Sequence, residues 1–177
     1  TATNTQSIAT TQNQLNARFD ALSVGGRNLW LNSKVKFDGN DGASTVSITE
    51  NYIEVTPTYN GGYIYVWLTG DNAGEYTISL DAEAPSVELT LAIGYTETGG
   101  SRSWVVTGKK RCFITMTRKD GERGILIIRV YNAPSVKLSN FKLEKGNVAT
   151  DWTPAPEDID QKFTETDANI RNTYITK

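Results

Sequence analysis

The sequence predicts an all-β, antiparallel sandwich with a short helix at each end, and two patterns indicate this fold class. The middle of the chain alternates short runs of β-branched and aromatic residues with clusters of turn-forming residues. The two ends lack such runs and space their few apolar residues in heptads. The expected segments are a helix at 1–25, the sandwich at 26–152, and a proline-rich linker with a second helix at 153–177.

The N-terminal segment is expected to form an oligomeric coiled coil. Ile8, Leu15 and Leu22 are seven residues apart. A helix with so few apolar residues buries too little surface to be stable alone, so partner helices are expected. The alternative is a frayed tether. The pair Gly25-Gly26 is expected to end the helix, because glycine readily adopts the left-handed conformation found at the C′ position.

The central segment contains about ten candidate strands. They are Asn28–Asn32, Thr45–Thr49, Tyr52–Thr56, Tyr63–Thr69, Glu75–Asp81, Val87–Tyr95, Ser103–Thr107, Arg111–Arg118, Gly124–Tyr131 and Val136–Glu144. Alternation supports these assignments, since Tyr76, Ile78 and Leu80 share one face of their run and Thr77 and Ser79 share the other. Short strands at this even spacing favour an antiparallel sandwich.

The C-terminal segment resembles the first in its thin heptad pattern. Prolines and the acidic pair Glu157-Asp158 suit a linker followed by the first turn of a helix. Ile159, Phe163 and Ile170 then follow at intervals of four and seven residues. A sandwich between two coiled-coil helices is typical of a bead on an oligomeric fibre, where trimers are the usual solution, but the sequence does not fix the number of chains.

The composition excludes several kinds of chemistry. Without histidine the chain has neither a Ser-His-Asp nor a Cys-His catalytic system, and no imidazole-ligated metal. The one cysteine, Cys112, is expected to be a buried small apolar residue. A formal net charge of −2 argues against sequence-independent nucleic-acid binding. No apolar run approaches the length needed to span a membrane. The chain begins with Thr1, which we interpret as the mark of a piece of a longer protein.

Two motifs bracket the central segment. The first is Gly26–Ser33, GRNLWLNS, and the second is Phe141–Asp158, FKLEKGNVATDWTPAPED. With them the chain resembles the carbohydrate-binding-module-like domains in tail, baseplate and minor structural proteins of phages that infect Gram-positive bacteria such as lactococci and streptococci. Those domains open with GRNLLxN and close with KLEKGxxATxWTPAPED. Trp30 stands where the first motif usually has Leu, at an expected core position.

The resemblance implies a jelly-roll sandwich in a virion protein that helps the phage tail adhere to host cell-wall saccharide. The implied partners are a host cell-surface polysaccharide, further copies of the chain in a trimer, and other tail or baseplate proteins. The tail at 160–177 also resembles the helical connectors beside such domains. From the residues themselves, Trp152 is expected to staple the emerging helix to the sandwich, with a ligand contact as the alternative.

Saccharide binding requires aromatic platforms beside polar partners, and one strand offers them best. Tyr63, Tyr65 and Trp67 share one face of that strand, opposite Ile64 and Val66. The aliphatic face is the simpler core face, which leaves the aromatic residues outside. The alternative places the aromatic face inward and covers the aliphatic residues with loops or a neighbouring subunit.

Tyr95, Arg102 and Trp104 form a second candidate group around a glycine turn. In the alternative interpretation Trp104 starts a strand and packs inward. Tyr131 is a weaker third candidate. No cofactor is expected, although jelly-roll binding modules often carry structural calcium, for which Asp38 and Asp41 are candidate ligands without a defined loop spacing.

Three hypotheses follow. The leading one is a non-catalytic saccharide-binding module, and the second is a purely structural spacer or trimerisation bead without a saccharide ligand. A hydrolase is the third, and it is disfavoured because no carboxylate pair stands in a recognisable catalytic frame.

Overall fold

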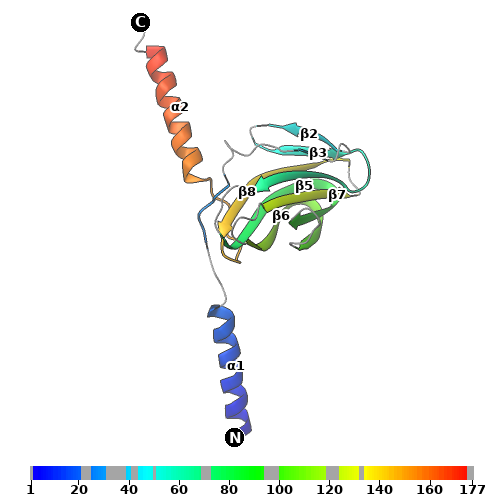
Figure 1. Cartoon of the computed structure of the whole chain (residues 1–177), viewed down its shortest axis with the longest axis vertical. Coiled ribbons are helices and arrows are strands. Elements are labelled where there is room, and N and C mark those ends of the chain that lie inside the picture. The colour runs from blue at the N-terminus through cyan, green and yellow to red at the C-terminus, as the bar shows by residue number, and fades with distance from the viewer. Residues whose placement is uncertain are drawn as a thin grey trace.

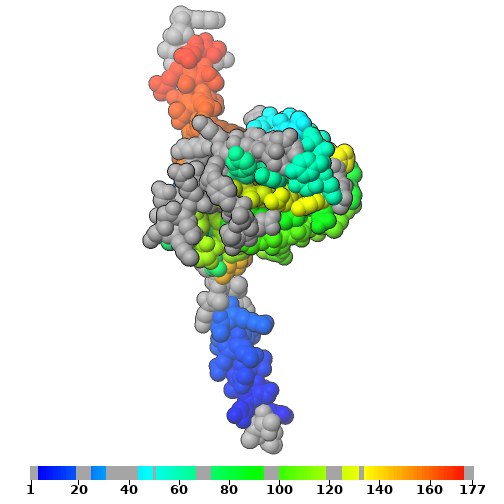
Figure 2. Space-filling model, turned by 45° about the vertical axis from the view of Figure 1, so that its right-hand side comes forward, coloured from blue at the N-terminus to red at the C-terminus, as the bar shows by residue number. Residues whose placement is uncertain are grey.

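The computed structural model describes residues 2–20, 25–30, 39–40, 44–49, 51–68, 73–93, 100–118, 124–131 and 134–174. Within these ranges eight strands lie between an N-terminal and a C-terminal helix. Figures 1 and 2 show the strands gathered into one body, from which the two helices project at opposite ends. The predicted antiparallel jelly-roll sandwich with a helix at each end is confirmed.

The strands pair antiparallel throughout the described residues. They are β1 (Gly39–Asn40), β2 (Ser44–Ile48), β3 (Ile53–Pro57), β4 (Gly62–Leu68), β5 (Gly74–Ile93), β6 (Ser101–Arg118), β7 (Gly124–Tyr131) and β8 (Val136–Lys145). Their order is β1-β4-β7-β5-β8-β3-β2, and β6 pairs with β5 outside this path. The first half of β5 pairs with β8 and the second half with β7, so β5 belongs to two layers.

We call these the β8 layer and the β7 layer. The β8 layer consists of β2, β3, β8, residues 74–84 of β5 and residues 108–118 of β6. The β7 layer consists of β1, β4, β7, residues 87–93 of β5 and residues 101–106 of β6.

The hairpin of β5 and β6 crosses from one layer to the other. Its register shifts between Ala84 and Val87, where Pro85 lacks an N–H and so suits an interrupted ladder. Opposite Ala84, Gly108 has a φ of +74°, a conformation that glycine adopts without strain. The sequence predicted four short strands here, but two long ones are present because backbone pairing resumes directly beyond the bend.

Two further predictions differ from the structure. The described residues 28–30 of the expected strand Asn28–Asn32 are not in a strand, although the Leu29 N–H donates to the Leu143 carbonyl at 2.7 Å. Conversely, β1 lies within the turn-forming residues 38–42. Its two residues form a strand because they pair with Ile64 and Tyr65 of β4.

The main core lies between the two layers and is built from the inward residues of alternating strands. Tyr76, Ile78 and Leu80 are buried in it, as predicted. Thr77 and Ser79 lie on the other face, as predicted, but they are also fully buried. Hydrogen bonds compensate for this burial, since Thr77 donates to the Gly146 carbonyl and Ser79 accepts from Arg111. The predicted core positions Trp30 and Cys112 are likewise confirmed.

The helices are α1 (Ala2–Asp20) and α2 (Pro156–Tyr174), and neither is long and apolar enough to cross a membrane. Pro156 opens α2 with Glu157 and Asp158 in its first turn, as predicted. The expected heptad residues of the described parts are exposed; they are Ile8, Leu15, Ile159, Phe163 and Ile170. Leu22 lies outside the described residues, and coiled-coil pairing itself stays a prediction.

Candidate functional site

The two end motifs meet in one junction, and Asn28 is its centre. Its side-chain amide donates to the carbonyls of Phe141 at 3.1 Å and Thr153 at 2.8 Å. Its side-chain oxygen accepts from the backbone N–H groups of Trp30 at 2.9 Å and Leu143 at 3.2 Å. One buried side chain therefore ties the N-terminal segment of the sandwich to β8 and to the segment that leads to α2.

A buried ion pair completes the junction. Glu144 accepts from the Thr150 N–H at 2.9 Å, the Thr150 hydroxyl at 2.6 Å and the Gly26 N–H at 3.0 Å. The Lys142 ammonium lies 3.6 Å from Glu144 and donates to the Thr150 hydroxyl and to the Asp151 carbonyl. Burial by itself would raise the pKa of Glu144, but these hydrogen bonds and Lys142 hold it below its ordinary value. Lys142 and Glu144 of the second motif are therefore scaffold.

The aromatic strand predicted as the best site is β4, and its aliphatic face is the inner one. Ile64 and Val66 are fully buried in the main core. Tyr63 and Tyr65 are half-buried on the opposite face. There they pack against a small apolar cluster formed by Ala92, Ile125 and Ile127. The Trp67 backbone continues β4 opposite Ile125, but its side chain lies outside the described residues.

A row of polar side chains runs from Tyr63 across the outer face of the β7 layer. Arg129 is the register partner of both Tyr63 on β4 and Thr90 on β5, and Thr90 is in turn opposite Ser103 on β6. The Arg129 guanidinium lies 4.8 Å from the centre of the Tyr63 ring, and the Thr90 and Ser103 hydroxyls are 2.7 Å apart. We call these four residues together with Tyr65 the tyrosine face.

The second predicted group lies on β6, and the structure brings two of its three members together. The Arg102 guanidinium carbon is 5.2 Å from the centre of the Trp104 ring and 4.3 Å from that of Phe113. Trp104 is half-buried against the main core, as the alternative interpretation held, whereas Arg102 is exposed. Tyr95 lies outside the described residues. Phe113 was not predicted as part of this group, because its distance along the chain hides the contact.

The remaining candidates contribute less. Tyr131 is half-buried and fits against Gly61, where an added Cβ would lie 2.8 Å from its ring. The candidate calcium ligands Asp38 and Asp41 lie outside the described residues. In the part of the chain that the structure describes, no three His, Cys, Asp or Glu side chains are grouped to hold a metal ion. Burial raises the pKa of the Cys112 thiol to about 11, so it stays protonated at neutral pH.

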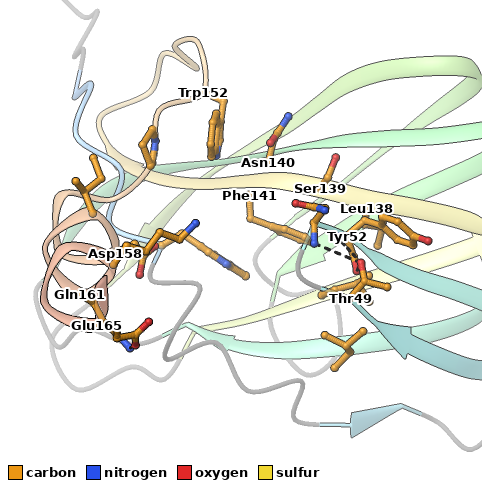
Figure 3. A pocket seen from close by; sticks show the side chains of 17 residues that line it. Thr49, Tyr52, Leu138, Ser139, Asn140, Phe141, Trp152, Asp158, Gln161 and Glu165 are labelled. Atoms are coloured by element: carbon orange, nitrogen blue, oxygen red, sulfur yellow. Dashed lines mark hydrogen bonds between the residues drawn. The ribbon is translucent and has the colours of Figure 1, made fainter. Parts of the chain in front are cut away.

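A pocket of about 630 Å³ lies between α2 and the β8 layer, and no sequence pattern indicated it. Side chains from several segments line it, and Trp152 and Tyr52 are among them. In Figure 3 Asp158, Gln161 and Glu165 of α2 lie at one side of the pocket, and Thr49 and Tyr52 lie at the other. Trp152, which was expected to staple the emerging helix to the sandwich or to contact a ligand, lies in the pocket wall between the two and is 39% exposed. Only its two neighbouring prolines hinted that the chain turns here.

Comparison with known proteins adds the following. No protein-family profile matches the chain, and no curated protein matches it in sequence. The solved structure of TmCBM61 in complex with β-1,4-galactotriose is 17% identical, with 68% of this chain and 99% of that chain covered and a TM-score of 0.48. The CBM22-1 xylan-binding domain of Paenibacillus barcinonensis Xyn10C is 14% identical, with 63% and 86% covered and a TM-score of 0.48. Similarity at this level concerns the sandwich fold alone.

Proposed function

We propose that this chain is a non-catalytic saccharide-binding module of a phage tail or baseplate protein, where it helps the virion adhere to host cell-wall polysaccharide. The tyrosine face carries the saccharide part of this proposal. The two motifs that resemble phage tail domains support the virion part, together with the exposed heptad residues of the two helices.

The tyrosine face has the two elements that sugar recognition needs. The half-exposed rings of Tyr63 and Tyr65 supply apolar surface for the C–H face of a pyranose. Arg129 and the exposed Ser103 supply polar groups on the same face as these rings, and the buried Thr90 hydroxyl between them bonds to Ser103. Because Ile64 and Val66 already fill the core, the aromatic rings are not needed there, and they remain for an external contact.

Helix α2 supports assembly with further copies of the chain. Four of the five α2 residues that line the pocket are polar, namely Asp158, Gln161, Lys162 and Glu165, and the fifth is Ile159. The next residues of the apolar row, Phe163 and Ile170, do not line the pocket, and Phe163 is 71% exposed. A helix that packed only on its own domain would turn its apolar row inward, so the heptad row is suited to helices of other copies.

The test of saccharide binding is calorimetry with purified host cell-wall polysaccharide. We expect binding by the wild-type chain. Tyr65→Ala removes one aromatic ring, and we expect it to lower the affinity about tenfold, which is a loss of roughly 1.4 kcal/mol in binding free energy. Trp67→Ala and Trp104→Ala test the remaining predicted aromatic residues. Tyr59→Ala is the matched control, because Tyr59 is exposed in the turn before β4 and lies outside the tyrosine face.

A structural spacer is the second candidate, and the exposed apolar residues of the two helices favour it. Ile8 and Phe163 are exposed although they are apolar, as contacts between helices of different copies would require. The spacer predicts no polysaccharide binding, and it predicts that Trp67 is shielded in the assembled oligomer. The difference in acrylamide quenching between wild type and Trp67→Phe measures this shielding directly.

A further inference from the structure

The pocket between α2 and the β8 layer owes its shape to an irregularity in β8. The register of β5 and β8 shifts between Ser79 and Asp81, which leaves Asn140 in a bulge with a φ of 52°. The strained residue is held from two sides, because its amide donates to Asp81 at 2.8 Å and its carbonyl accepts from Arg111 at 2.6 Å. In a regular strand, neighbouring side chains point to opposite faces. Here four successive residues, 138–141, all line the pocket.

Aromatic side chains form much of the wall. Trp30 and Phe141 are stacked with ring centres 4.9 Å apart and planes inclined by 14°. Both are buried, so they form a firm apolar floor. Trp152 and Tyr52 stand at the rim with part of their rings exposed. These four aromatic residues supply apolar surface to the pocket. Its volume of about 630 Å³ is in the range of small-molecule binding sites.

The segment that carries Tyr52 is fixed in advance. The Thr49 hydroxyl donates to the Tyr52 carbonyl at 2.9 Å and accepts from the backbone N–H groups of Asn51 at 3.3 Å and Tyr52 at 3.1 Å. The Lys137 ammonium lies 4.8 Å from the centre of the Tyr52 ring and holds it from the other side. A ligand therefore meets a preformed wall, which lowers the entropy cost of binding.

Helix α2 adds polar groups on the side opposite Tyr52. Asp158, Lys162 and Glu165 follow at helical spacing on one face, and Glu165 accepts from the Gln161 amide at 2.8 Å. Two carboxylates and one ammonium give this wall a surplus of one negative charge, which disfavours anionic ligands. The combination of flat apolar rings, carboxylate acceptors and an ammonium donor is suited to the hydroxyls of a neutral sugar.

We propose that this pocket is a second saccharide site, which binds one or two rings of a neutral pyranose saccharide between the sandwich and α2. The inference rests on the proposed saccharide-binding function and adds a site that lies on the other layer from the tyrosine face. Because its walls come from both the β8 layer and α2, a bound sugar contacts the sandwich and the C-terminal helix at once.

The experiment is saturation-transfer NMR and calorimetry on the full chain, with cellobiose and N,N′-diacetylchitobiose as neutral probes and digalacturonic acid as the anionic comparison. We expect at least one neutral disaccharide to bind and the acidic one not to bind. Tyr52→Ala and Glu165→Ala are each expected to weaken that binding about fivefold or more, through loss of a ring or of an acceptor. Glu165 is exposed on a helix, so its variant keeps the fold intact if Tyr52→Ala does not.

Asp167→Ala is the matched control, since Asp167 is an exposed acidic residue of the same helix and pairs with Arg171 away from the pocket. It is expected to bind the probe like wild type. If the probe binds with equal affinity to wild type and both pocket variants, the pocket is not a saccharide site. A loss of affinity in Tyr65→Ala alone would then still support the proposed function. Binding of the acidic disaccharide, abolished by Lys162→Ala, would overturn the neutral-sugar assignment. No binding of any probe and none of wall polysaccharide would overturn both proposals.

Discussion

The junction at the two ends of the sandwich and the tyrosine face both carry polar side chains, but the two sets differ in burial. In the junction, Asn28 makes four hydrogen bonds and Glu144 accepts three, all from within the chain. On the tyrosine face, Tyr63 and Tyr65 remain half-exposed and Arg129 lies beside a ring. Side chains that are fully buried and bonded within the chain therefore indicate scaffold, and half-exposed rings indicate a candidate binding surface.

The sharpest test of this contrast is Glu144→Ala. It leaves the Lys142 ammonium buried without its carboxylate, so we expect a loss of about 3–5 kcal/mol in the free energy of unfolding. Urea denaturation followed by tryptophan fluorescence measures it. Asp167→Ala, which breaks an exposed pair one turn apart on α2, should change stability by less than about 0.5 kcal/mol. Equal effects of the two variants would contradict the assignment of the junction as scaffold.

Gly25→Ala tests how closely the two ends of the sandwich approach. A Cβ at residue 25 would clash with the Lys145 carbonyl oxygen, and that oxygen belongs to the backbone and cannot rotate away. We expect a loss of about 1–3 kcal/mol, as for overpacking elsewhere. Gly100→Ala is a less crowded comparison, since no atom lies within 4 Å of its added Cβ, although its φ of +94° adds strain of its own. A fully stable Gly25→Ala variant would show that the junction is looser than described.

The junction should contribute to the pH dependence of stability. Since the pKa of Glu144 in the folded chain lies below its ordinary value of 4.5, the unfolded chain binds the proton first as the pH falls. The stabilisation is therefore complete above about pH 5 and is lost below it, as the pH falls through the folded pKa. Unfolding of wild type and Glu144→Gln at pH 7 and pH 3 measures this. We expect the difference between the two stabilities to be smaller at pH 3 than at pH 7, and a constant difference would refute the role of the charge.

The smallest effect on stability is expected from the tyrosine face. Tyr65→Ala removes a ring that is only half-buried outside the main core, so a loss of about 1 kcal/mol is expected. Circular dichroism during thermal unfolding gives the value. A loss as large as that of Glu144→Ala would mean that the tyrosines belong to the scaffold, and it would favour the spacer over the binding module.

Local patterns predicted much of this fold. Alternation placed Tyr76, Ile78 and Leu80 on one face, and that face is in the core, because a side chain's face in a strand depends only on its neighbours along the chain. The same local patterns divided β5 and β6 into four strands. Pro85 and Gly108 indicate the end of a strand as long as the partner strands are unknown. The start of α2 was likewise predictable, because prolines and acidic residues act on the first helical turn directly.

The site was less predictable for a physical reason. Asn28 and Leu143 lie 115 residues apart, and nothing in either neighbourhood specifies the other. The pocket depends on a register shift in β8, and the φ of Asn140 is decided by Asp81 and Arg111 in other strands. Arg102 and Phe113 meet only because β6 bends. Sequence patterns thus identified aromatic residues as candidates, but they did not distinguish the rings that face outward from those that fill the core.

The shared carboxylate of Glu144 has a mechanical consequence. Gly26 and Thr150, at the two ends of the sandwich, are both fastened to this one side chain, and Arg27 reaches Glu157 at the start of α2. Tension applied through the helices passes along this short bridge rather than through the strands. The sandwich lies to one side of the line that joins the helices in Figure 1. A sandwich mounted in this way carries little of such a load, so its surfaces keep their shape under tension.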